Sequence, residues 1–137
     1  MEKEHILVVD DEEGLLHLVK MRLTAMGFDV TGCTTGREAI AAAKKDRFDL
    51  VVADLRLGSE DGLDVTEELL RIHPGLPVII LTAHGSIPNA VEAMQRGAFG
   101  YLTKPFDDKE LKAKIEEGLS PQRMRGEIQR LKSLVNE

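Results

Sequence analysis

Residues 5–16, with the sequence HILVVDDEEGLL, join an apolar run to four consecutive acidic side chains. Residues 6–9 have the composition of a buried strand, and the Asp-Asp-Glu-Glu of residues 10–13 then places like charges side by side. Ending a buried strand in a cluster of carboxylates costs free energy unless a partner compensates their charge. The stretch therefore predicts a buried strand that delivers acidic residues to a site.

Short apolar runs and helical patterns alternate along the rest of the chain. Strands are predicted at residues 5–10, 28–33, 49–53, 77–82 and 99–103. Two of these runs, LVVA and VIIL, are continuously apolar, which is typical of strands covered on both faces. Five strands alternating with five helices predict an α/β fold, a doubly wound five-stranded parallel sheet. The strand order expected for this sheet is the flavodoxin-like 2-1-3-4-5, one of the common orders of such folds.

Composition and charge limit the classes of function. Of the 137 residues, 42% are hydrophobic and 31% are charged, which indicates one globular domain. Residues 1–119 carry 14 basic and 22 acidic side chains, and this excess of acid argues against direct binding of nucleic acid. No run is long enough to cross a membrane, and MEKEH lacks the apolar core of a signal peptide. The single cysteine, Cys33, excludes a disulfide framework, so a cytoplasmic location is expected.

Polar residues suited to binding or catalysis follow four of the predicted strands. Asp10 and Asp11 follow the first strand, Asp54 the third, Thr82 the fourth and Lys104 the fifth. Ligands bind open parallel sheets at the carboxyl ends of the strands, and the order 2-1-3-4-5 brings the three aspartates together. Carboxylates this close need a cation, and Mg²⁺ with its oxygen ligands is the usual one.

The remaining polar groups suit phosphoryl transfer. An aspartate in a Mg²⁺ site can act as a nucleophile and become an acyl phosphate. Thr82 offers a hydroxyl and Lys104 an ammonium, both suited to phosphate oxygens. A cis peptide bond between Lys104 and Pro105 can aim the lysine into the site.

The motifs LVVDDE, VVADLRLGSEDG, PVIILTAHGS and GYLTKPF resemble those of the receiver domain of two-component response regulators, over residues 4–119. The resemblance implies that Asp54 is the phosphoacceptor, charged from a phosphohistidine on a sensor histidine kinase. It also implies that Asp10, Asp11, Asp54 and the backbone carbonyl of Arg56 bind Mg²⁺, with Asp10 acting through water. By the same resemblance, Thr82 and Lys104 grip the phosphoryl group.

The resemblance also implies a conformational switch. Tyr101 matches the family's switch aromatic, which fills the space that Thr82 leaves when it moves toward the phosphate; the plainer interpretation is packing at a strand edge. Arg56 and His84 match variable positions that flank the phosphate and tune dephosphorylation, or they are solvated surface. Gly58 departs from the family, which commonly has proline there, and a glycine predicts a freer loop before phosphorylation.

Residues 82–106, TAHGSIPNAVEAMQRGAFGYLTKPF, resemble sigma-54-dependent activators of the NtrC type. That likeness implies an AAA+ ATPase and a DNA-binding module as downstream neighbours, and these 137 residues contain no G-x-x-x-x-G-K-[ST] loop. The output of such a domain is altered association, and a homodimer through the fourth helix, fifth strand, fifth helix and linker helix is expected.

A linker helix is predicted after the domain of residues 1–119. Ser120 and Pro121 read as an N-cap and a first helical position, so residues 120–137 are expected to form a separate helix. A heptad-like seam follows at Met124, Ile128, Leu131 and Val135. This helix either packs back on its own domain, or pairs with a second copy and leads into an absent output domain.

Three other functions are alternatives to a phosphorylation switch. A Mg²⁺-dependent phosphatase of the haloacid dehalogenase type needs a carboxylate two residues after the nucleophile, where this chain has Arg56. A flavodoxin-like cofactor binder needs a phosphate-cradling loop after the first strand, where this chain has acids. A stand-alone receiver that acts by protein binding is the third alternative.

Overall fold

The computed structural model describes residues 3–83 and 87–135. Its main sheet contains β1 (His5–Val9), β2 (Asp29–Cys33), β3 (Leu50–Asp54), β6 (Val78–Ala83) and β7 (Gly100–Lys104). The helices are α1 (Glu13–Ala25), α2 (Gly36–Lys45), α3 (Gly62–Ile72), α4 (Ile87–Gln95) and α5 (Asp108–Val135). All strand pairs of this sheet are parallel, in the order β2-β1-β3-β6-β7, which confirms the predicted order.

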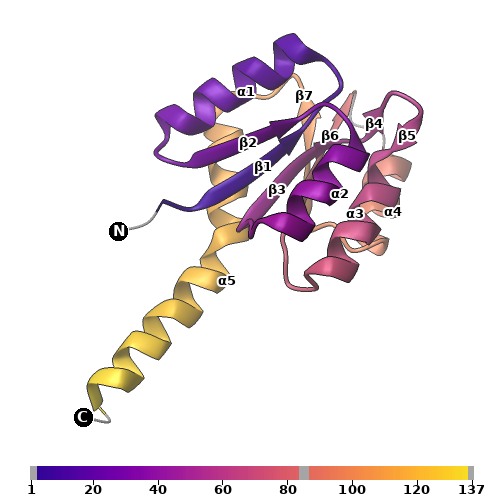
Figure 1. Ribbon diagram of the computed structural model, residues 1–137. Coiled ribbons are helices and arrows are strands. Elements are labelled where there is room, and N and C mark those ends of the chain that lie inside the picture. The colour runs from indigo at the N-terminus through magenta and orange to yellow at the C-terminus, as the bar shows by residue number, and fades with distance from the viewer. Residues whose placement is uncertain (1–2, 84–86, 136–137) are drawn as a thin grey trace.

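Helices cover both faces of the sheet (Figure 1). One core contains Leu7, Val9, Val51, Ala53, Val78 and Ile80 with side chains of α2, α3 and α4. The other contains Ile6, Val8, Leu50, Val52, Ile79 and Leu81 with side chains of α1 and α5. Successive strand residues thus point into opposite cores, which explains why the runs are continuously apolar. Each buried aliphatic side chain contributes roughly 1.5–3 kcal/mol, so the strand ends are held on a rigid frame.

A small antiparallel hairpin that the sequence did not predict follows β3. It consists of β4 (Arg56–Leu57) and β5 (Glu60–Asp61), and it is separate from the main sheet. Gly58, in its turn, has a φ of +65°, which a proline cannot adopt because its ring fixes φ near −65°. The glycine therefore fits this turn, where a proline would not.

The predicted helix start at Ser120 is wrong, because α5 continues from Asp108 through Pro121 to Val135. Proline removes one backbone hydrogen bond from a helix interior, but tertiary contacts on both sides of it hold this helix in place. Before the proline, Leu119 is fully buried. After it, Gln122 Nε2 donates to the Asp49 carbonyl at 2.7 Å, and the Arg123 guanidinium pairs with Glu4.

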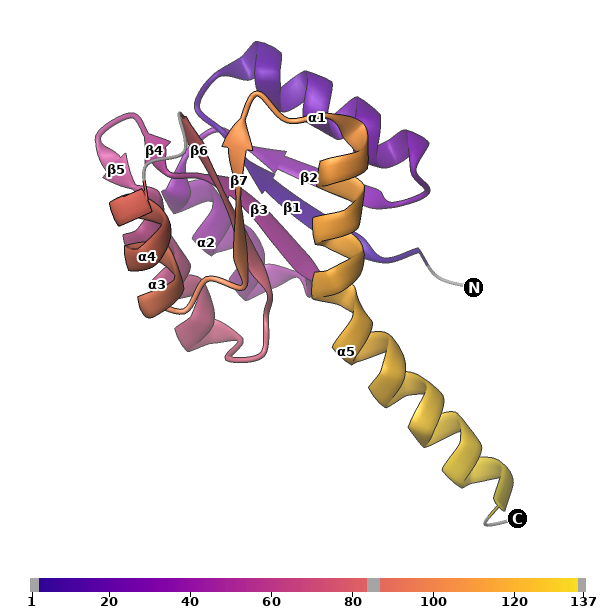
Figure 2. The same ribbon diagram turned by 180° about the vertical axis from the view of Figure 1, so that it is seen from behind.

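Beyond Arg123 the helix leaves the domain and projects away from it (Figure 2). The four seam residues are all exposed, at 62% for Met124, 50% for Ile128, 48% for Leu131 and 82% for Val135. The interpretation in which this segment packs back on its own domain is therefore wrong for this structure. Among the described residues, no helix combines the length and apolar character that spanning a membrane requires.

Candidate functional site

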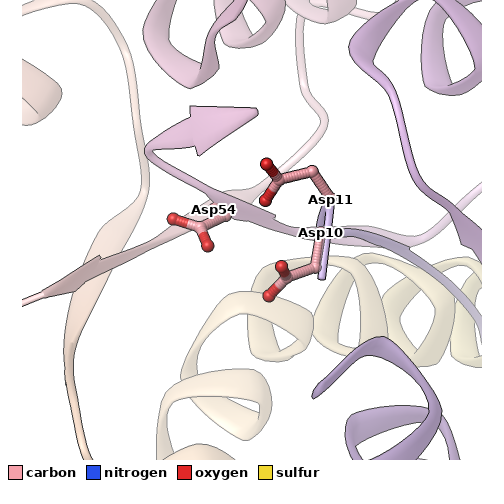
Figure 3. Close-up of side chains that lie close together, drawn as sticks. All are labelled: Asp10, Asp11 and Asp54. Carbon is pink, nitrogen blue, oxygen red and sulfur yellow. The ribbon is translucent and has the colours of Figure 1, made fainter. Parts of the chain in front are cut away.

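Three aspartates meet at the carboxyl edge of the sheet (Figure 3). Asp10 directly follows β1 and Asp54 ends β3, and these strands are neighbours with Val9 paired to Ala53. One carboxylate oxygen from each of Asp10, Asp11 and Asp54 lies within 4.8 Å of the others. The structure therefore brings together the three acids that the sequence predicted to converge.

Asp10 carries a buried oxygen that lacks a protein partner. The residue is only 1% exposed, and its Oδ1 accepts a hydrogen bond from the Glu12 N–H at 3.0 Å. Its Oδ2 has no hydrogen-bond partner, since the Lys104 ammonium stands 3.7 Å away. A buried carboxylate oxygen in this condition is destabilising unless a cation approaches it. The donor set of three carboxylates fits a hard divalent ion such as Mg²⁺.

Lys104 compensates part of the negative charge. Its Nζ lies 2.6 Å from Asp54 Oδ2, while Asp54 Oδ1 accepts from the Arg56 N–H at 3.2 Å. Burial by itself lowers the pKa of Lys104, but the hydrogen bond and the attraction of Asp54, with the charge of Asp10, outweigh it and raise the pKa. The lysine thus stays protonated, and one cation faces three carboxylates. The peptide bond between Lys104 and Pro105 is cis.

Burial raises the pKa of Asp10 above its ordinary value, and it outweighs the Glu12 N–H and the Lys104 charge, which lower the pKa; the neighbouring carboxylates add to the rise. An Asp with a raised folded pKa costs stability when ionised, and this cost disappears as the pH falls below the ordinary value of 3.8. We expect Asp10→Asn to stabilise the metal-free protein at pH 7 by about 1 kcal/mol. The gain in Tm should shrink as thermal unfolding is followed down to about pH 4.

Asp46→Asn is the matched control, because Asp46 is exposed. Its Tm should equal that of the unaltered protein across the same pH range. A lower Tm for Asp10→Asn at pH 7 in the absence of divalent metal contradicts the interpretation of Asp10 as a buried charge that Lys104 compensates only in part.

Thr82 and Tyr101 lie on neighbouring strands next to this cluster. Thr82 pairs with Thr103, and Ile80 with Tyr101, so Thr82 and Tyr101 point to the same face of the sheet. Thr82 is buried at 1% exposure, whereas Tyr101 is 41% exposed and lines a cavity of about 430 Å³ between β7 and α5. Arg56 is exposed, and His84 lies outside the described residues.

Glu60 is a contact residue that sequence reasoning missed. Its carboxylate accepts the backbone N–H groups of Gly36 and Arg37, at 2.8 and 3.1 Å, and so caps α2 from the β4–β5 hairpin. No local pattern could have revealed this cap, because Glu60 and the helix it caps are more than 20 residues apart in the chain.

A family model described as the response regulator receiver domain matches residues 6–116. This chain belongs to that family. The transcriptional regulatory protein GlrR of Escherichia coli (strain K12) is 46% identical over 115 residues, which are 84% of this chain and 26% of GlrR. The DNA-binding transcriptional regulator NtrC of Salmonella typhimurium is 38% identical over 120 residues, or 88% of this chain and 26% of NtrC.

Solved structures agree with the sequence relatives. A crystal structure of NtrX from Brucella abortus matches with a TM-score of 0.86 and 33% identity, covering 95% of this chain and 30% of that chain. The receiver is therefore similar to those of NtrC-type regulators, as its sequence indicated. This chain spans about a quarter of the length of the two curated relatives. A receiver domain is a signalling switch, so the match supports neither a phosphatase nor a flavodoxin-like cofactor binder.

Proposed function

We propose that this receiver accepts a phosphoryl group on Asp54 from the phosphohistidine of a sensor histidine kinase, in a reaction that requires Mg²⁺. The observation that carries the proposal is the acidic cluster with a buried, unpartnered Asp10 oxygen and a lysine on Asp54. Asp10, Asp11 and Asp54 with the backbone carbonyl of Arg56 would hold the ion, Asp10 through water. When bound, Mg²⁺ neutralises charge on the phosphoryl oxygens and lets the anionic donor approach.

Asp54 supplies the nucleophile. Its carboxylate oxygen forms the new P–O bond as the P–N bond of the phosphohistidine breaks, and the imidazole leaves with the electron pair. Lys104 is already 2.6 Å from Asp54, so it needs only a short movement to pair with the new phosphoryl oxygens. Thr82, at the end of the neighbouring strand, donates its hydroxyl to the same group.

The switch follows from these new contacts. As Thr82 turns toward the phosphoryl group, the outward ring of Tyr101 moves into the vacated space, and two arrangements of α4 and β7 exchange population. Arg56 would tune the lifetime of the phosphoryl group by shielding it from water or admitting water. His84, for which the resemblance implies the same role, lies outside the described residues.

The decisive test weighs the intact protein after incubation with acetyl phosphate. With Mg²⁺ present we expect one added phosphoryl group, and with Mg²⁺ removed by a chelator we expect none. Steady release of phosphate from small phosphomonoesters would instead favour the phosphatase. Unchanged mass in the presence of Mg²⁺ and the donor contradicts the proposal.

The output we propose is a change in association that regulates transcription. Residues 1–119 act as the receiver, and residues 120–137 connect it to an output domain, an AAA+ module that activates sigma-54-dependent transcription. Relatives named as transcriptional regulators support this role. Because bacterial transcription takes place in the cytoplasm, the same relatives also support a cytoplasmic location. The acidic receiver itself does not contact DNA. A stand-alone receiver acting by protein binding is the second candidate, favoured by the exposed apolar seam.

The homodimer is proposed to form through α4, β7 and α5, including the linker segment. We expect sedimentation analysis to show a different monomer–dimer equilibrium when a stable acyl-phosphate mimic occupies Asp54. Ile128→Glu should weaken the association, because it places a charge in the apolar seam. Met21→Glu, on the exposed surface of α1, is the control and should leave it unchanged. Identical sedimentation with and without the mimic contradicts the proposal.

A further inference from the structure

The β4–β5 hairpin lies beside the acidic cluster. It includes Arg56, and a Cβ placed on Gly58 would come within 3.9 Å of Asp11 Oδ2, so its turn approaches a proposed metal ligand. Only two residue pairs join its strands, Arg56 with Asp61 and Leu57 with Glu60. A hairpin this short is marginal by itself, so its position depends on contacts with the rest of the domain.

One of those contacts is made by Glu60 across to α2. Its two carboxylate oxygens accept the N–H groups of Gly36 and Arg37, which have no partner within the helix because they lie in its first turn. The negative charge also suits the positive end of the helix dipole. The next donor, the Glu38 N–H, is satisfied separately by Thr35 Oγ1 at 3.0 Å. Glu60 thereby ties the hairpin to a helix that packs on the sheet.

Gly36 makes this arrangement sterically possible. A Cβ on Gly36 would lie 2.4 Å from Val65 Cγ2 and 2.9 Å from Glu60 Oε2. A side chain there would displace the Glu60 carboxylate or push α2 away from α3. The sequence therefore combines a glycine and a glutamate that fit only together.

We propose that Glu60 is a positioning residue for the metal site: by fixing the hairpin on the N-terminus of α2, it holds the Arg56 backbone and the Gly58 turn against Asp11 and Asp54. This inference rests on the proposed Mg²⁺ site. The base of the hairpin is held independently, because the Gly62 N–H donates to the Leu55 carbonyl at 2.7 Å. Losing Glu60 should therefore loosen the hairpin without unfolding the domain.

The test measures the Mg²⁺ dissociation constant of the whole chain by isothermal titration calorimetry. We expect Glu60→Ala to weaken Mg²⁺ binding by about tenfold, the size of effect that supporting residues around metal sites commonly have. Glu60→Gln keeps one acceptor oxygen, so its Mg²⁺ dissociation constant should lie between those of the unaltered protein and Glu60→Ala. Gly36→Ala should reproduce the weakening, and the double variant should show no additional loss, because both changes break the same contact.

Thr35→Ala is the matched control, since it removes a cap from the same helix without touching the hairpin. It should lower the Tm as Glu60→Ala does but leave the Mg²⁺ dissociation constant unchanged. Equal Mg²⁺ affinities for Glu60→Ala and the unaltered protein overturn the inference, as do equal losses in Glu60→Ala and Thr35→Ala. If the unaltered protein itself binds no Mg²⁺, the proposed function fails as well, so the two failures are distinguishable.

Discussion

Asp54→Asn is expected to take up no phosphoryl group from acetyl phosphate, at any Mg²⁺ concentration. An amide oxygen is a much poorer nucleophile than a carboxylate oxygen. The substitution also removes the ionic partner of Lys104, whose Nζ lies 2.6 Å from Asp54 Oδ2. The loss should be complete in an intact-mass measurement, whereas the unaltered protein gains one phosphoryl group under the same conditions.

Asp29→Asn provides the control for this experiment. Asp29 is exposed and begins β2, the edge strand that contributes nothing to the acidic cluster. It should be phosphorylated like the unaltered protein. Modification of Asp54→Asn at the unaltered level would show that another group is the acceptor, and the assignment of Asp54 would then be wrong.

Gly62→Ala is expected to have the largest effect on stability. A Cβ at this position would lie 2.2 Å from the Asp54 carbonyl oxygen and 2.9 Å from the Leu55 Cα and carbonyl oxygen. These are backbone atoms, so they cannot turn aside as a flexible side chain would. We expect the free energy of unfolding, measured in urea, to fall by about 3 kcal/mol or more.

Gly14→Ala and Gly126→Ala are the controls, because a Cβ at either position meets no atom within 4 Å. Both lie in helices, where replacing glycine by alanine should stabilise the protein by about 0.5–1 kcal/mol. A Gly62→Ala variant as stable as these controls would show that the backbone around Asp54 yields easily, contrary to the tight contact in the structure.

The sheet and the acidic cluster were predictable from the sequence for a shared reason. Runs such as residues 50–53 are apolar at every position, which requires burial on both faces and hence helices on both sides of a parallel sheet. Once the strand order is assigned, the edge at which Asp10 and Asp54 meet follows from geometry. Short-range patterns therefore determined the elements, and the strand order expected for such a fold then determined the place of the cluster.

The features that were missed depend on contacts between distant residues. Strands of two residues are too short to produce a periodic pattern, so the β4–β5 hairpin and the Glu60 cap were invisible. Ser120 and Pro121 suggested a helix boundary. In the structure, Gly118 is a site of close packing, since a Cβ there would approach Leu50 Cδ1 to 2.7 Å, and α5 continues past both residues.

The unbroken course of α5 makes the receiver and its projecting segment a single mechanical arm. From Leu119 to Val135 the helix advances about 24 Å, so a tilt of about 5° where it lies on the sheet would displace the far end by about 2 Å. A rotation of the helix about its axis also reaches the far end, because each residue of a helix lies at a constant angle around the axis from the one before it. The packing of Leu111, Ile115 and Leu119 against the sheet sets the rotation of α5 about its axis. That rotation in turn determines the direction in which Ile128 and Leu131 point.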